Sequence, residues 1–159
     1  MQTRTAALVS IGSVAAAALV GGSFGPQEPS AGVWYASLRK PPFTPPGSVI
    51  GITWGFLETL LCVAGTRLLG SPPSSARGVA LASWAATLVG LAGYPAVFFG
   101  RKRLGESAVV ATAMFAATAA TTAAAERVDK PASAAMAPLV LWTGFAVVLS
   151  EELLRLRAR

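Results

Sequence analysis

Histidine is absent from this sequence of 159 residues, and cysteine occurs once, at Cys62. The chain therefore offers no Cys/His metal cluster, no histidine-based catalytic triad and no disulfide within one molecule. Charged residues are also scarce, at 13%. The 13 Lys and Arg outnumber the 7 Asp and Glu, but they are dispersed between long apolar segments instead of forming the basic face of a nucleic-acid-binding domain. We expect no metal site, no obligatory cofactor and no nucleic-acid partner, and we assign no catalytic residue.

Apolar residues make up 53% of the chain, and the mean hydropathy is +0.59. About 20 apolar residues suffice for a helix to cross the hydrocarbon core of a bilayer. Five such segments occur, so the sequence predicts an all-α integral membrane protein, a single domain over residues 1–159 that forms a five-transmembrane-helix bundle. The first segment also has features of a signal peptide, but its apolar run is longer than usual and we expect a retained helix. The expected helices cover about residues 5–25, 47–69, 78–100, 106–125 and 132–154.

The distribution of basic residues predicts how the bundle is oriented. Five crossings place the N-terminus with the second and fourth loops, and the C-terminus with the first and third loops. The N-terminal side carries Arg4, Arg67, Arg77, Arg127 and Lys130, whereas the opposite side carries the other eight basic residues. By the positive-inside rule, the C-terminus is cytoplasmic and the N-terminus lies outside.

Residues 26–46 form the longest connection and contain six prolines. Because proline fixes φ and removes a backbone donor, residues 40–46 are expected to be a stiff extended cover and not a helix. Trp34 and Tyr35, which precede this cover, suit a membrane–water interface. We expect the segment to act as a lid over one end of the bundle.

Glu58 is the only acidic residue away from the ends of an expected span, and it follows Trp54 by four residues. Both side chains therefore share one helical face. Because a carboxylate inside a bilayer is costly unless it is paired or wetted, this face should point into the bundle. Glu58 is then either a ligand-binding or proton-coupled group, or a neutral acid bonded within a packed interior.

Aromatic residues recur at helical spacing on two other expected spans. Trp142 and Phe145 begin one such face, and Tyr94 with Phe98 forms a shorter one. The spacing alone fits a packed core as well as a cavity.

Small residues are also informative: the span 106–125 is rich in Ala and Thr and should pack closely against a neighbour, and a GxxxG spacing on the second span suits internal packing or self-association.

Four segments of the chain resemble motifs of the TspO/translocator-protein family, also called tryptophan-rich sensory proteins or the peripheral-type benzodiazepine receptor family. The family pattern around its first loop is roughly WYxxLxKPxWxPP, followed at fixed spacing by a Trp. Two further family motifs, WxxxFFG and PYxxW, have counterparts in the same order. The matching segments are Trp34–Pro46, Ile50–Trp54, Tyr94–Gly100 and Pro138–Trp142.

The resemblance implies a five-helix membrane bundle, commonly a homodimer, whose pocket is closed by the first loop and binds porphyrins and other tetrapyrroles. Trp54 and Trp142 match pocket tryptophans of the family, while Phe43 and Tyr94 take the places of two others. An aromatic cavity with few polar anchors suits such a flat ligand. The expected ligand-binding residues are Trp34, Tyr35, Phe43, Pro45, Trp54, Glu58, Tyr94, Phe98, Trp142 and Phe145.

The chain also departs from the family pattern. Leu91, Leu139 and Ser150 stand where the family usually has Asn, Tyr and Asn, and Glu58 stands where it commonly has Tyr. The pocket should thus be less polar on two walls and acidic on a third. No tyrosine follows Tyr94, so the sterol-recognition pattern of the family's last helix is missing and a sterol is a less favoured ligand.

Three hypotheses about function remain open from the sequence. The first is a membrane receptor or transporter that binds a hydrophobic small molecule, in particular a porphyrin or haem-type tetrapyrrole. The second is an enzyme that degrades a tetrapyrrole in light, with a pocket tryptophan taking part in the redox chemistry without a metal. The third is a divergent membrane scaffold or regulatory protein that has lost its ligand. All three have the lipid bilayer as a partner.

Overall fold

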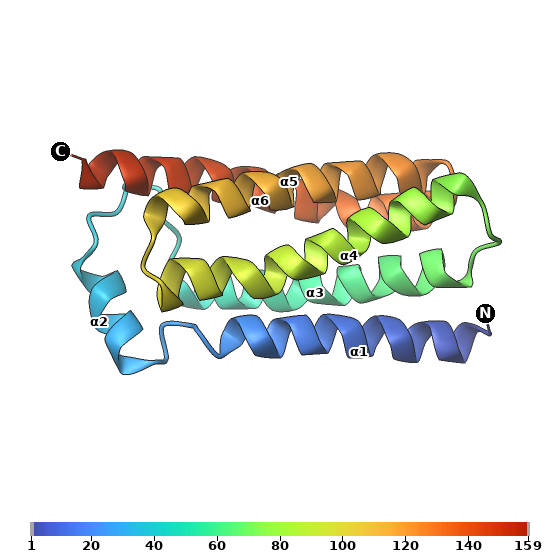
Figure 1. The fold of residues 1–159 in the computed structure, drawn as a ribbon, viewed down its shortest axis with the longest axis horizontal. Helices are drawn as coiled ribbons and strands as arrows, with labels where there is room; N and C mark the ends of the chain where they lie inside the picture. The colour runs from blue at the N-terminus through green and yellow to red at the C-terminus, as the bar shows by residue number, and fades with distance from the viewer. Residues whose placement is uncertain (1, 159) are drawn as a thin grey trace.

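Five long apolar helices run up and down through the computed structural model, which describes residues 2–158 (Figure 1). Each is long and apolar enough to cross a membrane, and no strand occurs among the described residues. The predicted all-α, five-span bundle is confirmed. The elements are α1 (Thr3–Gly22), α2 (Pro29–Ser37), α3 (Gly47–Gly70), α4 (Ser75–Pro95), the π-helical segment η1 (Ala96–Gly100), α5 (Leu104–Glu126) and α6 (Lys130–Arg157).

The five long helices form a closed ring. Helix α1 packs between α3 and α4, α5 packs between α4 and α6, and α6 returns to α3. Helix α2, the η1 segment and the C-terminus lie at one end of this ring, and the N-terminus lies at the other (Figure 1). We call the first of these the lid end.

The outer surface of the bundle is rich in large apolar side chains, unlike that of a soluble protein. Large apolar side chains cover the outside: Leu8, Leu19, Ile52, Val89 and Leu141 are between 72% and 77% exposed. The interior is mainly apolar but also contains hydroxyl side chains, which bond to helix carbonyls or to other hydroxyls. This arrangement suits a bilayer, in which apolar side chains face lipid and small residues allow helices to approach closely. The buried hydroxyl residues are Ser10, Thr87, Ser107, Thr118, Thr121, Ser133, Thr143 and Ser150.

The closest approach of α1, α3 and α4 occurs at Gly65. The Ser10 hydroxyl donates to the Cys62 carbonyl at 2.8 Å, and the Trp84 indole N–H donates to the Leu61 carbonyl at 3.1 Å. A Cβ atom on Gly65 would lie only 2.4 Å from the Ser10 hydroxyl oxygen and 2.4 Å from the Trp84 ring. Two side-chain hydrogen bonds to α3 therefore depend on a glycine at this position.

At the end opposite the lid, Arg67 of α3 is paired with Asp129, which precedes α6. The two N–H···O distances are 2.7 and 3.0 Å, and the same carboxylate accepts the Ala132 backbone N–H at 2.8 Å. The hydrogen bond from Arg67 is the main reason that the pKa of Asp129 lies below its ordinary value. The pair joins α3 to the start of α6. From the sequence, Arg67 was counted only among the basic residues of the N-terminal side and was assigned no partner.

The segment 26–46 is not the uniformly irregular lid loop expected from its prolines, because it contains the nine-residue helix α2. The Glu28 carboxylate accepts the Ala31 backbone N–H at 2.9 Å, and Pro29 occupies the first turn, where its missing N–H is harmless. The pair Glu28-Pro29 is thus a helix start signal, which was overlooked because the prolines of this segment were considered together. Residues 40–46 are non-helical, as predicted.

The third span was expected to be one α-helix to residue 100, and it instead changes to a π-helix after Pro95. The Arg101 N–H donates to the Ala96 carbonyl at 2.9 Å, which is the i to i−5 bond of a π-turn. Proline supplies no N–H to the α-helical ladder, so a change of hydrogen-bond pattern beside it is physically reasonable. The wider turn is important because it forms one wall of the site described next.

Candidate functional site

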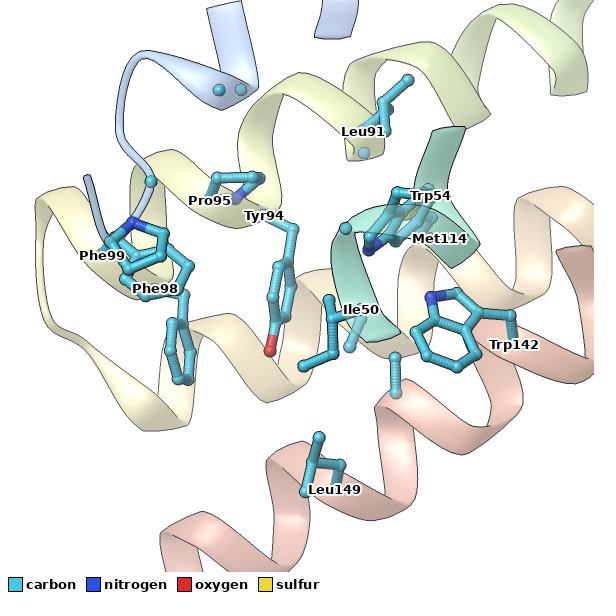
Figure 2. A pocket seen from close by; sticks show the side chains of 18 of the residues that line it. Ile50, Trp54, Leu91, Tyr94, Pro95, Phe98, Phe99, Met114, Trp142 and Leu149 are labelled. Carbon is cyan, nitrogen blue, oxygen red and sulfur yellow. The ribbon is translucent and has the colours of Figure 1, made fainter. Parts of the chain in front are cut away.

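A cavity of about 360 Å³ lies inside the ring, towards the lid end (Figure 2). All five long helices, η1, and residues of the α1–α2 connection and α2 contribute to its wall. We call it the bundle cavity. Of the ten predicted ligand-binding residues, seven line it: Tyr35, Trp54, Glu58, Tyr94, Phe98, Trp142 and Phe145.

Two tryptophans form the wall of the cavity furthest from η1 (Figure 2). The rings of Trp54 and Trp142 are 6.4 Å apart between centroids and almost perpendicular, at 89°. Phe145 follows on α6 with its centroid 5.4 Å from that of Trp142. Edge-to-face aromatic contacts of this kind hold ring orientations and leave other ring faces free for a ligand.

Tyr94 stands between the tryptophans and the η1 phenylalanines (Figure 2). Its ring stacks on Phe98 at 5.6 Å and 13°, and its hydroxyl is hydrogen-bonded to that of Ser150 at 2.9 Å. The Tyr94 hydroxyl is thus already satisfied within the protein. Ser150, at one of the positions where the sequence departs from the family pattern, has become the partner of Tyr94. Leu91 lines the cavity, whereas Leu139 is buried in the core and does not.

The π-turn at η1 explains how two consecutive phenylalanines reach the same cavity. Phe98 and Phe99 are in edge contact at 4.8 Å and both belong to the lining. Successive residues of an α-helix point about 100° apart, and the wider π-turn alters these directions locally. The sequence marks the turn only through Pro95.

Helix α2 is held against η1 by aromatic contacts. Trp34 packs edge-on against Phe98 at 5.3 Å, and Tyr35 contacts Phe98 at 6.1 Å and Phe99 at 5.6 Å. Burial in this cluster raises the pKa of the Tyr35 phenol. The ammonium group of Lys40 lies 4.4 Å from the centre of the Tyr35 ring, a cation–π contact. We call α2 with these contacts the lid.

A polar contact secures the other edge of the lid. The Lys102 ammonium group lies 3.3 Å from the Ser30 carbonyl, and the Ser30 hydroxyl donates to Glu28 at 2.6 Å. This hydrogen bond is the first cause of the lowered pKa of the Glu28 carboxyl. The groups are exposed, so their electrostatic contribution is screened by water.

Three predicted site residues are not part of the cavity lining. Trp34 supports the lid through Phe98, as described above. Phe43 is 47% exposed and contacts the outer side of the aromatic wall through Phe145, at 6.3 Å. Pro45 is half-buried outside the lining. Trp34 and Phe43 thus contact residues of the cavity wall without belonging to it themselves.

Sequence reasoning missed most of the small residues that create the cavity. Gly21 and Gly51 line it, and a Cβ on Gly51 would meet nothing within 4 Å. On Gly21 a Cβ would instead lie 2.7 Å from the Leu91 carbonyl, so that glycine is required for α1 to approach α4. Met114 of α5 forms part of the wall as well (Figure 2). No sequence pattern had distinguished these residues from ordinary helix-packing positions.

Glu58 is the only charged residue in the cavity wall. It is half-buried, and its carboxyl group has no hydrogen bond or ion pair with any residue between 2 and 158. No group of three potential metal ligands occurs in the described part of the chain, so Glu58 has no companions with which to hold a metal ion there. The cavity is therefore an aromatic and aliphatic space with one isolated acid.

Comparison with known proteins extends these observations. The model of the TspO/MBR family matches residues 10–156. The chain is 34% identical over 123 residues to the tryptophan-rich sensory protein of Cereibacter sphaeroides, covering 77% of this chain and 76% of the relative. It is 32% identical over 123 residues to the translocator protein of Ovis aries, covering 76% and 72%. The tryptophan-rich protein TspO of Chlorobaculum tepidum is 30% identical over 147 residues, 92% of each chain.

Proposed function

The chain belongs to the TspO/MBR family of multi-pass membrane proteins, and from this premise we propose that it binds a flat hydrophobic molecule of the porphyrin or tetrapyrrole class in the bundle cavity. The observation that carries the proposal is the wall formed by the perpendicular rings of Trp54 and Trp142. The protein would act as a receptor or transporter for this ligand.

The physical properties of the cavity suit a conjugated macrocycle. Small-molecule sites are typically apolar clefts of about 300–1,000 Å³ with a few polar groups that fix orientation. The bundle cavity falls in this range at about 360 Å³ and is lined mainly by aromatic, aliphatic and glycine residues. Exposed ring faces of Trp and Tyr provide stacking surfaces for a planar ligand. An open cavity also favours ligand binding over the scaffold hypothesis, which requires side chains to fill the interior.

The experiment is a titration of the detergent-solubilised protein with protoporphyrin IX, followed both by tryptophan fluorescence and by the porphyrin absorbance band. A Gly51→Phe variant places a ring in the cavity, whereas the matched Gly12→Phe variant adds the same ring on α1 at an exposed position that is not part of the lining. Saturable binding that is at least tenfold weaker in Gly51→Phe and unchanged in Gly12→Phe is expected. Equal affinity in both variants would place the porphyrin elsewhere.

The Trp54→Leu/Trp142→Leu variant tests the aromatic wall itself. Because this change removes two of the four tryptophans, the absorbance band of the porphyrin, and not fluorescence quenching, must report its affinity. Loss of stacking on two rings is expected to weaken binding by tenfold or more. The same titrated sample, illuminated, tests light-dependent degradation: bilin-like absorbance beyond that formed from free porphyrin would identify an enzyme.

We propose further that the lid end faces the cytoplasm, with the N-terminus outside. This rests on the eight basic residues of the first and third loops and the C-terminal segment, compared with five on the opposite side. Cysteine labelling in intact cells tests it, with Cys62 replaced by serine and a single cysteine introduced at Ala36 or at Ser74. Only the Ser74→Cys protein should react with an impermeant maleimide added outside.

A homodimer is also proposed, through the exposed face of α3 that carries Gly55. A Cβ there meets nothing within 4 Å in the monomer, so a second helix has room to approach. Light scattering in mild detergent should give twice the monomer mass. A Gly55→Leu variant should shift the equilibrium to the monomer, and an unchanged mass would exclude this face.

A further inference from the structure

The isolated position of Glu58 provides information about the ligand. Among the described residues it is the only charged one that lines the bundle cavity, and its carboxyl oxygens accept no hydrogen bond from residues 2–158 and are not enclosed by protein atoms. Of the nearby polar groups, the Thr143 hydroxyl bonds to the Leu139 carbonyl and to Thr118, and the Tyr94 hydroxyl bonds to Ser150. The hydroxyls of Thr143 and Tyr94 are thus bonded within the protein, whereas the accessible Glu58 carboxyl has no partner among residues 2–158.

Glu58 also lies at the inner end of the cavity. Helix α3 enters at the lid end with Gly47, and Glu58 is the last residue along it that belongs to the lining. Eleven residues separate them, which at 1.5 Å per residue is about 16 Å. Glu58 follows Trp54 by one helical turn, and Trp54 in turn contacts Trp142. The acid is thus placed beyond the two tryptophans, at the deepest point that a ligand entering under the lid would reach.

An acid in such an environment favours one kind of ligand group. A carboxylate without partners in apolar surroundings is costly, and a bound cation or N–H donor offsets this cost by direct hydrogen bonding. The faces of tryptophan rings also attract cations. A ligand carboxylate in the same place would gain none of these interactions from an ionised Glu58 and would be repelled by it.

We propose that Glu58 is a specificity-determining residue, which selects hydrophobic ligands that carry a basic nitrogen at the end entering first. This inference rests on the proposed function, because it concerns the same cavity. The charged groups are distributed in a matching way, with the acid at the inner end of the cavity and basic groups at the lid end. Two basic groups, Lys40 against Tyr35 and Lys102 against Ser30, contact α2 at the lid end. A ligand with acidic groups would therefore enter with its nitrogen inward and those groups toward the lid.

Three porphyrins of one ring structure test the inference. They are protoporphyrin IX dimethyl ester, which is neutral at its side chains, the bis-amide of protoporphyrin IX with ethylenediamine, which carries two ammonium groups, and protoporphyrin IX itself. Their affinities are measured by absorbance in the same detergent for the wild-type protein and for Glu58→Gln. A Glu126→Gln variant serves as the matched control, because Glu126 is exposed at the end of α5 opposite the lid.

The expected result is that the wild-type protein binds the diammonium porphyrin about tenfold more tightly than the dimethyl ester, the ratio that one charge-assisted hydrogen bond provides. Glu58→Gln should remove this ratio, and a circular dichroism spectrum and Tm equal to those of the wild type would show that the variant is folded. Glu126→Gln should retain it. Glu58→Tyr, a second uncharged variant, should behave like Glu58→Gln.

The outcomes separate the two proposals. If the dimethyl ester binds but the diammonium porphyrin has no advantage, or if the advantage survives in both Glu58 variants, the selection by Glu58 is overturned and the cavity function stands. If none of the three porphyrins binds the wild-type protein, the proposed function fails and the selection fails with it. A further outcome is that the wild-type protein prefers protoporphyrin IX to the dimethyl ester, with a preference that increases when Glu58 is replaced. That result would overturn the nitrogen requirement alone, because it would show that the acid only repels anions.

Discussion

A methyl group added at Gly65 should destabilise the bundle, although alanine is the better helix former. In the native structure this residue is fully enclosed between α1 and α4, and the new Cβ would lie 2.4 Å from both the Ser10 hydroxyl oxygen and the Trp84 ring. Carbon contacts are optimal near 3.5–4.0 Å, so the neighbours must move by about 1 Å. Such a shift acts directly on the two hydrogen bonds that Ser10 and Trp84 make to carbonyls of α3.

The magnitude follows from three contributions to the free energy of unfolding. Overpacking of a close-packed interior costs about 1–3 kcal/mol. Weakening of a hydrogen bond adds about 0.5–1.5 kcal/mol. Replacement of glycine by alanine within a helix returns about 1 kcal/mol. Gly65→Ala should therefore be less stable than the wild type by about 0.5–3.5 kcal/mol, and the Tm should fall by about 1–14 °C.

The assay is thermal unfolding in a single detergent, followed by circular dichroism and by tryptophan fluorescence, to which Trp84 contributes. Gly12→Ala is the control, because a Cβ on Gly12 meets nothing within 4 Å and only the helix propensity changes. Its Tm should equal or exceed that of the wild type. A Gly65→Ala protein as stable as Gly12→Ala would refute the close approach of the three helices at this point.

Three further predictions concern single contacts. Tyr94→Phe removes the 2.9 Å hydrogen bond to Ser150 and should lower the free energy of unfolding by about 0.5–1.5 kcal/mol. In a double-mutant cycle, Ser150→Ala should cause no further loss of stability once Tyr94 is Phe. Additive effects of the two changes would argue against the bond. Phe98→Ala removes the 3% exposed ring on which Trp34 and Tyr35 pack. Amide hydrogens of α2 should then exchange faster, while those of α3 remain protected. Unchanged exchange in α2 would show that the lid is held by other contacts. Asp129→Asn tests the ion pair with Arg67. Because the pKa of Asp129 is lowered in the folded state, its charge stabilises the protein at a pH above the ordinary pKa of 3.8. This contribution is lost as the pH falls through the lower folded-state pKa. The wild type should therefore exceed Asp129→Asn in Tm at pH 5–7 and approach it below about pH 4; a constant difference would exclude the pair as the cause.

The fold was largely predictable because membrane spans depend on the length of apolar runs, a property that a single sequence displays directly. Helix α2 was missed for a physical reason. Proline is unfavourable inside a helix but acceptable in its first turn, and the prolines of residues 26–46 were read as one group. The π-turn at η1 was also missed, since its hydrogen bonds depend on how α4 packs against its neighbours as well as on Pro95. Boundaries elsewhere moved by a few residues, as helix ends commonly do.

The site was predicted where helical periodicity applies. Trp54 with Glu58, Tyr94 with Phe98 and Trp142 with Phe145 were paired by spacing along their own helices, and the structure places all six on the wall of the cavity. Periodicity along a single helix does not, however, predict a cavity between helices. The cavity exists because Gly51 and other small residues supply no side chains where five helices converge, and that coincidence involves residues from every part of the chain.

The departures from the family pattern form a connected set and not independent losses. Leu91 removes one polar group from the cavity wall, and the smaller Ser150 is bonded to the hydroxyl of Tyr94, which is therefore not free for a ligand. Polar recognition by side chains at the inner end is left mainly to Glu58, which stands where relatives commonly have a tyrosine. An acid accepts where a phenol can donate, so the preferred ligand should change from one that offers an acceptor to one that offers a nitrogen donor. On the proposal made above, the ligand supplies the partner that the Glu58 carboxyl lacks among the described residues.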